Sequence, residues 1–290
     1  MTSPIKFFTI ALVISFLYFS KIYAQKAEEK SLLWEVSGNG LKQPSYLYGT
    51  FHMLCPNDFK IDESLKKKLE NSGQLYLEID FDDFAGMMKL QEMVAFKDEK
   101  TIKDFLKAKD YEKLKQFFKD SLKTNLDQVG KSRPFFLQAL IYQKMMKCPV
   151  VVPEMVFMSE ILKQKKEVKG LEPVEAQMHV VEELGDKKMA EILVEEVAEF
   201  EKNKQLFEKM LTIYRAHDLE KLLQFVSESP EYKGFTEVLL NDRNKSWIPV
   251  IEKAVTEKPT FFAFGAGHLA GEEGVIALLR KKGFTVKAIN

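Results

Sequence analysis

The chain contains 290 residues, and its 43 lysine and arginine residues balance 43 aspartate and glutamate residues, so the formal net charge is zero. Proteins that bind nucleic acid through the phosphate backbone need a basic face, and this balance gives no reason to expect one. The length is sufficient for a full-sized hydrophobic core, in one domain or two. We therefore expect a globular protein without a nucleic-acid partner.

The first 24 residues have the pattern of a secretory signal peptide. Lys6 precedes an almost unbroken apolar run from Phe7 to Phe19, and the small residue Ala24 stands before a polar stretch. The alternative is a membrane anchor, but this run is shorter than the roughly 20 residues that a spanning helix needs. No later stretch is long and apolar enough to span a bilayer. We expect cleavage after Ala24, no stable membrane span afterwards, and a periplasmic or extracellular location.

The next part of the chain predicts a strand, a helix and a second strand. Ser45 to Thr50 is a short aromatic and apolar run, and Gln74 to Ile79 is another. Between them, Ser64 to Asn71 has the pattern of a polar helix that ends before Gly73. This alternation is typical of an α/β sheet, in which we expect the second strand to lie beside the first.

Two helical tracts occupy the middle of the chain. Apolar residues recur at helical spacing from about Phe84 to Met146, and a second tract runs from Glu175 to about Val255. Between the tracts, Glu167 to Leu171 predicts a strand, and Pro149 to Pro153 predicts a short one.

The C-terminal end returns to alternating elements. Thr260 to Phe264 predicts a buried strand, Glu272 to Lys282 a helix, and Phe284 to Ile289 a final strand. We therefore expect an α/β fold with some α+β character, in which both chain ends build a central mixed sheet around a large helical insertion. One domain would cover residues 25–290. Its sheet segments would lie at about 31–80, 148–172 and 258–290, and its helical insertions at about 84–147 and 173–256.

The two cysteines, Cys55 and Cys148, are each followed by proline. In an exported protein such a pair can form a disulfide. The alternative is two buried free thiols, because a sequence does not give the distance between them. Both possibilities stay open at this point.

Two of the four histidines follow predicted strands in the same Gly-x-x-His pattern. His52 ends the first copy, which starts at Gly49, and His268 ends the second, which starts at Gly265. Ligands of open α/β sheets bind beyond the carboxyl ends of the strands, so these two side chains can converge. A single histidine is more often an ordinary half-buried residue than a ligand. The repeated pattern favours a shared site.

Glu78 is the third candidate for this site. It stands near the end of the strand that we expect beside the one preceding His52. Imidazole and carboxylate are the usual ligands of a catalytic zinc, and they suit manganese and cobalt as well. A divalent ion held by His52, Glu78 and His268 would lower the pKa of a bound water and supply a nucleophile near neutral pH.

The turn after the strand at 260–264 is rich in glycine, including Gly265 and Gly267. Such turns can cradle phosphate, but neither a P-loop lysine nor a GxGxxG pattern accompanies this one. We interpret it as a tight turn that lets the backbone approach the site. Together with Gly49 and Glu172, these glycines are our candidates for substrate binding.

Arg243 is a weaker candidate for a catalytic role. It could clamp a carboxylate or stabilise an oxyanion. Glu172, which follows the predicted strand at 167–171, could face the same crevice. For both residues the alternative is an ordinary ion pair or helix cap.

Five blocks of the sequence resemble the TraB/GumN family. They are Leu47–His52, Leu77–Glu78, Gly170–Glu172, Asp242–Asn244 and Gly265–Ile276. The blocks occur in the family's order and extend over nearly all of the chain after residue 24. The C-terminal block is the most specific, followed by the Gly-Thr-Phe-His block.

The TraB/GumN family is related to the Tiki proteins, which are metal-dependent peptidases, and more distantly to erythromycin-esterase-like and haem-binding ChaN-like proteins. The resemblance implies a sheet with helical insertions and an active centre of two GxxH motifs and a glutamate. These positions match His52, His268 and Glu78, and Arg243 also matches a family position.

We therefore expect an exported metallohydrolase that acts on a peptide or another small substrate. His52, His268 and Glu78 would hold zinc, manganese or cobalt, or Glu78 would instead act as the base. Arg243 would orient the substrate or stabilise the oxyanion. The alternative is a non-catalytic protein that captures a peptide, haem or metal in the same crevice.

Overall fold

The structure, a computed structural model, describes residues 29–229 and 232–289. The chain divides into residues 1–30 and 31–290, and the fold described below is that of the second unit. The predicted signal peptide, residues 1–24, lies outside the described residues. Among the residues that are described, no helix is both long and apolar enough to cross a membrane.

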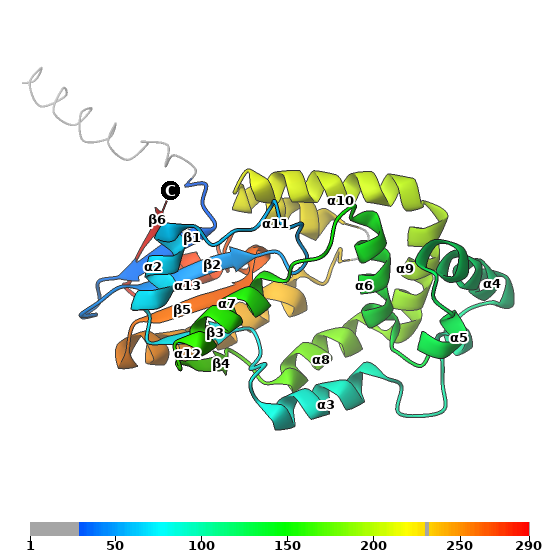
Figure 1. The fold of residues 1–290 in the computed structure, drawn as a ribbon, viewed down its shortest axis with the longest axis horizontal. Helices are drawn as coiled ribbons and strands as arrows, with labels where there is room; N and C mark the ends of the chain where they lie inside the picture. Colours follow the sequence, from blue (N-terminus) through cyan, green and yellow to red (C-terminus); the bar gives the residue numbers. More distant parts are fainter. Residues whose placement is uncertain (1–28, 230–231, 290) are drawn as a thin grey trace, which may run out of the picture. The chain divides into compact units, whose positions relative to one another are not determined.

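A mixed sheet lies at the centre of residues 31–290 (Figure 1). In the described part of the chain its strands are β1 (Leu33–Ser37), β2 (Ser45–Thr50), β3 (Gln74–Leu77), β4 (Glu167–Gly170), β5 (Thr260–Gly265) and β6 (Thr285–Ile289). Their order across the sheet is β4-β3-β5-β2-β1-β6. The first four of these are parallel, whereas β1 is antiparallel to both β2 and β6. The predicted α/β fold, with a mixed sheet built from both chain ends, is confirmed.

The sheet differs from the prediction in three details. β5 lies between β3 and β2, so the strand that precedes Glu78 is not beside the strand that precedes His52. Residues 149–153 form no strand, and Val151 makes only an isolated bridge with Leu54, because proline cannot donate to a ladder. The sheet also contains β1, between β2 and β6, which we did not predict as a strand.

Helices make up most of the remaining described chain. They are α2 (Glu63–Asn71), α3 (Phe84–Val94), α4 (Ala108–Phe117), α5 (Leu126–Val129), α6 (Pro134–Met145), α7 (Pro153–Lys163), α8 (Val174–Leu184), α9 (Asp186–Ala198), α10 (Phe200–Arg215), α11 (Leu219–Glu228), α12 (Asp242–Glu257) and α13 (Val275–Lys281). Short or irregular turns are η1 (Ile102–Phe105), η2 (Phe118–Leu122), η3 (Glu237–Asn241) and η4 (Ala266–His268). α7 packs on β3, β4 and β5, while α4, α6, α9 and α10 pack on one another as a helical part of the unit (Figure 1).

The central strand β5 is apolar because helices cover both of its faces. Phe261 packs against Phe157 of α7, with ring centroids 5.1 Å apart. Phe264 packs against Trp247 of α12 at 5.4 Å. Residues separated by an odd number of positions point to opposite faces of a strand, so α7 and α12 lie on opposite sides of the sheet. A continuous apolar run is the expected sequence for a strand buried in this way.

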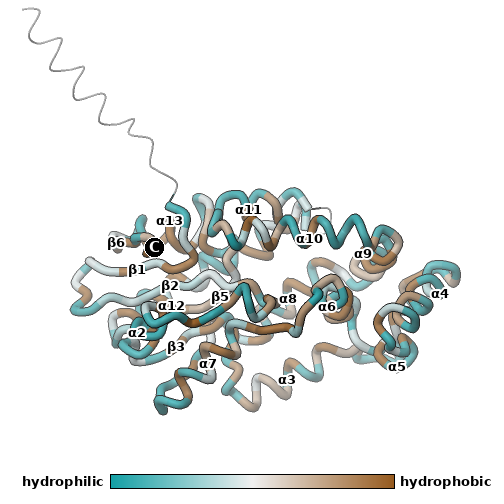
Figure 2. Tube along the Cα trace, turned by 45° about the horizontal axis from the view of Figure 1, so that its top comes forward, coloured by the Kyte–Doolittle hydropathy of each residue, from teal (hydrophilic) through white to brown (hydrophobic). Residues whose placement is uncertain are grey.

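The helical part is joined to the end of β2 through α10. Polar and apolar residues alternate along this helix (Figure 2). Its buried residues Phe207, Leu211 and Tyr214 are spaced as one helical face. The Tyr214 hydroxyl donates a hydrogen bond to the carbonyl oxygen of Gly49 in β2, at 3.1 Å. This contact fixes the backbone three residues before His52.

Candidate functional site

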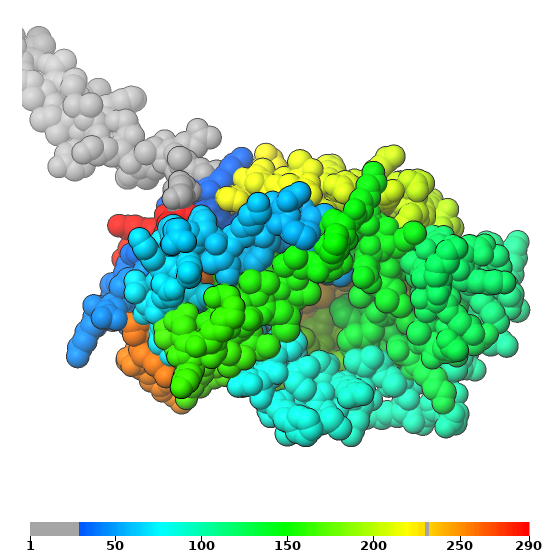
Figure 3. All heavy atoms as spheres, viewed as in Figure 1, coloured from blue at the N-terminus to red at the C-terminus, as the bar shows by residue number. Residues whose placement is uncertain are grey.

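The four parallel strands end at the same edge of the sheet, and each is followed by a candidate side chain. Glu172 follows β4, Glu78 follows β3, His268 ends the turn η4 after β5, and His52 follows β2. This edge is where ligands bind in open α/β sheets. The strands β2 and β5 run toward the helical part (Figure 1), and the molecular surface is hollowed between α3, α6 and α7 (Figure 3).

The two GxxH histidines converge on one carboxylate oxygen. His52 Nε2 lies 3.9 Å from Glu78 Oε1, and His268 Nε2 lies 4.0 Å from the same atom. Gly265 lies between them, and its N–H donates to Glu78 Oε1 at 2.8 Å. A β-carbon at Gly265 would lie 3.3 Å from Glu78 Oε1 and 3.5 Å from His52 Nε2. The absence of a side chain therefore keeps open the space into which both imidazoles point.

His52 is oriented by a residue that the sequence analysis missed. Its Nδ1 is 2.8 Å from Oε1 of Glu154, in the first turn of α7. The Thr50 hydroxyl donates to the same oxygen at 2.5 Å. The Glu154 side chain is 6% exposed, whereas the His52 side chain is 63% exposed. A buried carboxylate thus holds one edge of an imidazole whose other edge is open to the site.

His268 is oriented in the corresponding way by Asn244. Its Nδ1 lies 2.6 Å from Asn244 Oδ1, and because an amide oxygen only accepts, Nδ1 carries the proton. The Asn244 amide donates in turn to the carbonyl oxygen of Glu273, at 2.9 Å. The imidazole also packs on Trp247, with ring centroids 4.3 Å apart. Its Nε2 is left as an acceptor on the side of Glu78.

Arg243, in the first turn of α12, connects the acids of the site. Its Nη2 donates to Glu78 Oε2 at 2.6 Å and to Glu172 Oε1 at 2.5 Å, and its Nη1 lies 3.3 Å from His268 Nε2. Glu172 accepts a further hydrogen bond from Trp247 Nε1 at 2.8 Å. Glu172 therefore lies buried behind Arg243, where it fixes the direction of the guanidinium group.

The charges around Glu78 keep it ionised. Burial alone raises the pKa of this carboxyl, but the positive charge of the Arg243 guanidinium beside it holds the pKa well below its usual range. Glu78 Oε2 also accepts from the Gln177 amide of α8 at 3.1 Å. Both oxygens of Glu78 thus accept hydrogen bonds from the protein.

The two histidines have opposite pKa shifts. Burial lowers the pKa of His268 to about 3, opposed by Glu78 and reinforced by Arg243, so this imidazole is neutral near pH 7. For His52, burial lowers the pKa, but the charge of Glu154 more than compensates and raises it to about 9. Because the His52 side chain is 63% exposed, water screens its interaction with Glu154.

The side chains of the site are of the types that bind a divalent metal. Among the described residues, no three His, Cys, Asp or Glu side chains lie close enough together to hold an ion as they stand. Two ligands of one tetrahedral zinc are roughly 3.3 Å apart, and the histidine-to-Glu78 distances are 3.9 and 4.0 Å. The residues that would hold an ion are His52, Glu78 and His268. The Nε2 atoms of both histidines face Glu78, and His52 would give up its Nε2 proton on binding the ion.

The other two glycines of the motifs, Gly49 and Gly267, differ in how closely their neighbours approach. A β-carbon at Gly49 would lie 2.7 Å from Leu269 Cδ1, so its small size lets β2 approach η4. A β-carbon at Gly267 would meet only Leu240, at 3.7 Å. The nearest neighbours of a β-carbon at either position do not include Glu78, His52 or His268, whereas those of a β-carbon at Gly265 do.

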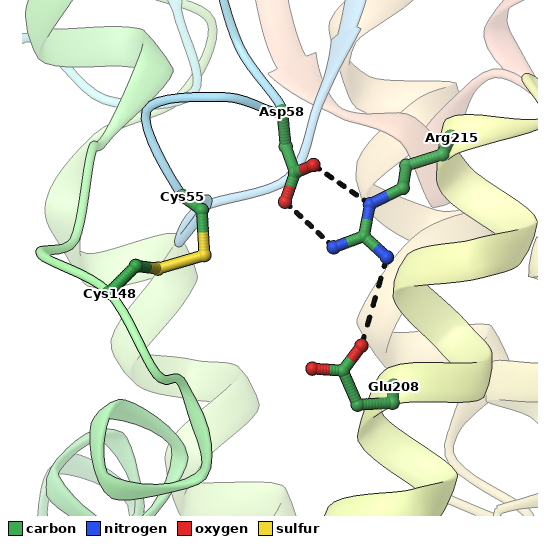
Figure 4. Close-up of a disulfide and its surroundings, with 5 residues drawn as sticks. All are labelled: Cys55, Asp58, Cys148, Glu208 and Arg215. Carbon is green, nitrogen blue, oxygen red and sulfur yellow. Dashed lines mark hydrogen bonds and ion pairs between the residues drawn. A yellow bond between two sulfur atoms is a disulfide. The ribbon is translucent and has the colours of Figure 1, made fainter.

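Cys55 and Cys148 form a disulfide, with Cα atoms 5.6 Å apart. It joins the loop after β2 to the segment before α7 (Figure 4). On the other side of that loop, Asp58 accepts two hydrogen bonds from Arg215 of α10, at 2.9 and 2.7 Å. The loop that begins with His52 is therefore held from two sides.

Comparison with known proteins gives one family and a small set of relatives. The model of the TraB/PrgY/gumN family matches residues 32–288. The chain is 24% identical to metalloprotease TIKI2 of Danio rerio, over 89% of this chain and 60% of the relative. It is 24% identical to metalloprotease TIKI2 of Xenopus tropicalis (89% and 59%) and 23% identical to metalloprotease TIKI1 of Danio rerio (90% and 64%). The chain thus spans about 60% of the length of these relatives. No solved structure gives a significant match.

Proposed function

The chain belongs to the TraB/PrgY/gumN family, and from this premise we propose that it is a divalent-metal-dependent hydrolase of peptides. His52, Glu78 and His268 hold the metal. The proposal rests above all on one observation: the Nε2 atoms of both GxxH histidines lie within 4.0 Å of a single oxygen of Glu78. The relatives named as metalloproteases support the reaction class.

The protein's own residues have separate roles in this proposal. A bound zinc, manganese or cobalt ion supplies Lewis-acid activation of a water and of the scissile carbonyl. Glu78 acts as a ligand and not as the base, because a carboxylate whose pKa is held well below its usual range is a weak base. Arg243, with Nη1 beside His268, provides a fixed positive charge for the oxygen that becomes negative in the transition state. The exposed side of His52 leaves room for the substrate.

We place this activity outside the cytoplasm, in the periplasm or beyond the cell. The pattern of residues 1–24 supports export. The Cys55–Cys148 disulfide supports it independently, because disulfides persist in oxidising compartments.

The second candidate function is capture without turnover, of a peptide, haem or metal. One observation favours it: Arg243 already pairs with Glu78 and contacts His268 Nε2. A cluster whose charges are compensated internally can bind a ligand without activating water. Exchange of His52 for alanine should abolish hydrolysis under the first proposal and only weaken capture under the second.

The deciding experiment is metal content measured by elemental mass spectrometry. Three proteins are loaded with zinc, manganese or cobalt and then desalted: wild type, the double variant His52→Ala, His268→Ala, and the control His179→Ala. His179 is an exposed histidine of α8. We expect about one ion per chain in wild type and in the control, and none in the folded double variant. No retained metal after any loading overturns the metallohydrolase proposal and leaves capture as the better one. Peptide-library hydrolysis by the metal-loaded protein then separates turnover from binding.

A further inference from the structure

The contact between His52 and Glu154 joins segments that are 102 residues apart in the sequence. His52 lies in the loop after β2, and Glu154 lies in the first turn of α7. Glu154 Oε1 faces His52 Nδ1, on the opposite side of the ring from the Nε2 that faces Glu78. The direction of Nε2 therefore depends on where α7 places this carboxylate.

Two further links hold the same pair of segments together. Leu54 and Val151 exchange backbone hydrogen bonds of 2.9 and 2.8 Å in an isolated bridge. The Cys55–Cys148 disulfide follows directly beside this bridge. Within four residues of His52 along the chain, a side-chain contact, a backbone bridge and a covalent bond thus all join the two segments.

The opposite side of the loop is fixed to the helical part. Asp58 forms a two-point ion pair with Arg215 of α10, and Arg215 also lies 3.7 Å from Glu208 (Figure 4). The Arg215 side chain is 38% exposed, so this ion pair contributes little to stability. The covalent link to the segment of Glu154 is the stronger of the two constraints.

We propose that Glu154 is a positioning residue for His52, and that the Cys55–Cys148 disulfide is the covalent part of the support that keeps their two segments aligned. This inference rests on the proposed function, in which His52 Nε2 is a metal donor. A histidine ligand that donates its other ring N–H to a carboxylate is fixed in orientation and becomes a stronger donor. Asn244 orients His268 in the same sense but carries no charge.

Four variants of the full chain test the inference. Glu154→Ala removes the carboxylate, and Glu154→Gln keeps an oxygen that can accept from Nδ1. Glu160→Ala is the matched control, because Glu160 lies on the same helix and pairs only with Lys163 among the ion pairs of the described residues. The double variant Cys55→Ser, Cys148→Ser removes the disulfide. Circular dichroism identifies the variants that remain folded.

The first measurement is zinc affinity, determined by competition with a chromophoric chelator. Glu154→Ala should bind zinc about 10–100-fold more weakly than wild type. Glu154→Gln should recover part of this loss, Glu160→Ala should match wild type, and the disulfide-free variant should show a smaller loss than Glu154→Ala. Equal affinity in Glu154→Ala and wild type overturns the positioning role of Glu154. Equal affinity in the disulfide-free variant overturns the supporting role of the disulfide.

The second measurement uses the metal-free protein, so it does not depend on the proposed function. The ring Nδ1–H of His52, assigned by its loss in His52→Ala, should give a downfield proton resonance in NMR spectra because it donates to a carboxylate. The resonance should persist in Glu160→Ala and disappear in Glu154→Ala. If wild type binds no zinc and this pattern is still found, the metallohydrolase proposal fails while the orientation of His52 by Glu154 stands. A resonance unchanged in Glu154→Ala overturns the inference whatever the metal result.

Discussion

Gly265 is the residue at which one added methyl group should separate metal binding from folding. Its φ is −51°, a backbone conformation open to any residue. The added carbon would lie within 3.3–3.6 Å of Glu78, His52 and His268. We predict that Gly265→Ala abolishes zinc binding and hydrolysis with little loss of stability, because the methyl group fills the space between the donors. Zinc titration and a denaturation curve on the same sample measure both effects.

Gly267→Ala is the matched control for that exchange. The same methyl group at Gly267 meets only Leu240, at the ordinary contact distance of 3.7 Å. Zinc binding should therefore be unchanged. Loss of zinc binding in both variants, or in neither, would show that the donors do not converge around Gly265.

Arg243 is the residue on which the two buried acids of the site depend. The side chains of Arg243, Glu78 and Glu172 are 13%, 9% and 3% exposed. Removing one partner of a buried ion pair leaves an uncompensated charge and costs about 3–5 kcal/mol. We predict a loss of this size for Arg243→Ala, measured by urea denaturation in the presence of a chelator.

A second arginine supplies the comparison for Arg243→Ala. Arg215 also pairs with a carboxylate, Asp58, but its side chain is 38% exposed, so Arg215→Ala should cost only about 0–1 kcal/mol. Adding Glu172→Gln to Arg243→Ala should restore part of the stability, since one unpaired charge is removed. Equal losses for the two arginines would contradict the buried network.

The sequence carried different amounts of information about the individual site residues. The Gly-x-x-His repetition identified His52 and His268 as a pair before any contact was known. Glu154 gave no comparable signal, because a glutamate in the first turn of a helix that begins with proline is common on helix dipole grounds alone. Asn244 lies within the block at 242–244 that resembles the family, but no pattern in the sequence gave it a role in the site. Their roles arise only from helix packing that brings α7 and α12 onto opposite faces of the sheet.

At the scale of elements, the disulfide joins two loops that belong to different parts of the chain. Cys55 and Cys148 are 93 residues apart, and a closed loop of this length restricts the unfolded chain considerably. Typical losses on removing a disulfide are about 2–4 kcal/mol, with larger values for longer loops. We predict a loss in this range for the double variant Cys55→Ser, Cys148→Ser, measured by denaturation without reductant. Reductant should reproduce the loss in wild type, and an unchanged midpoint in both cases would contradict the prediction.

The strands were easier to predict from the sequence than their pairing partners in the sheet. Thr260 to Phe264 is apolar throughout, which suits a strand covered on both faces, and β5 is found there. The position of β5 between β3 and β2 could not be predicted from the local sequence pattern, because β5 follows β2 and β3 by roughly 200 residues in the chain. β1 was missed because its burial alternates over only five residues. Pairing partners depend on the tertiary structure, whereas the patterning of one strand is local.

At the scale of the whole molecule, a metal that binds only the folded chain must stabilise it. An ion present at 100 times its dissociation constant contributes about 2.7 kcal/mol. For a unit of this size, 1 kcal/mol raises the melting temperature by roughly 2–4 °C, so zinc should raise it by roughly 5–10 °C. Thermal unfolding with and without zinc, followed by circular dichroism, measures the shift, and a chelator should reverse it.

The same shift shows where the ion binds, because the site draws on three strands from both ends of the chain. His52, Glu78 and His268 follow β2, β3 and β5, so they converge only when the whole sheet is formed and cannot bind as one site in the unfolded state. The shift should therefore vanish in His52→Ala, His268→Ala and persist in His179→Ala. An equal shift in the double variant would place the stabilising ion elsewhere on the protein. A shift lost in each single variant as well would mean that both histidines are needed together, as expected when each supplies one of three protein ligands to the same ion.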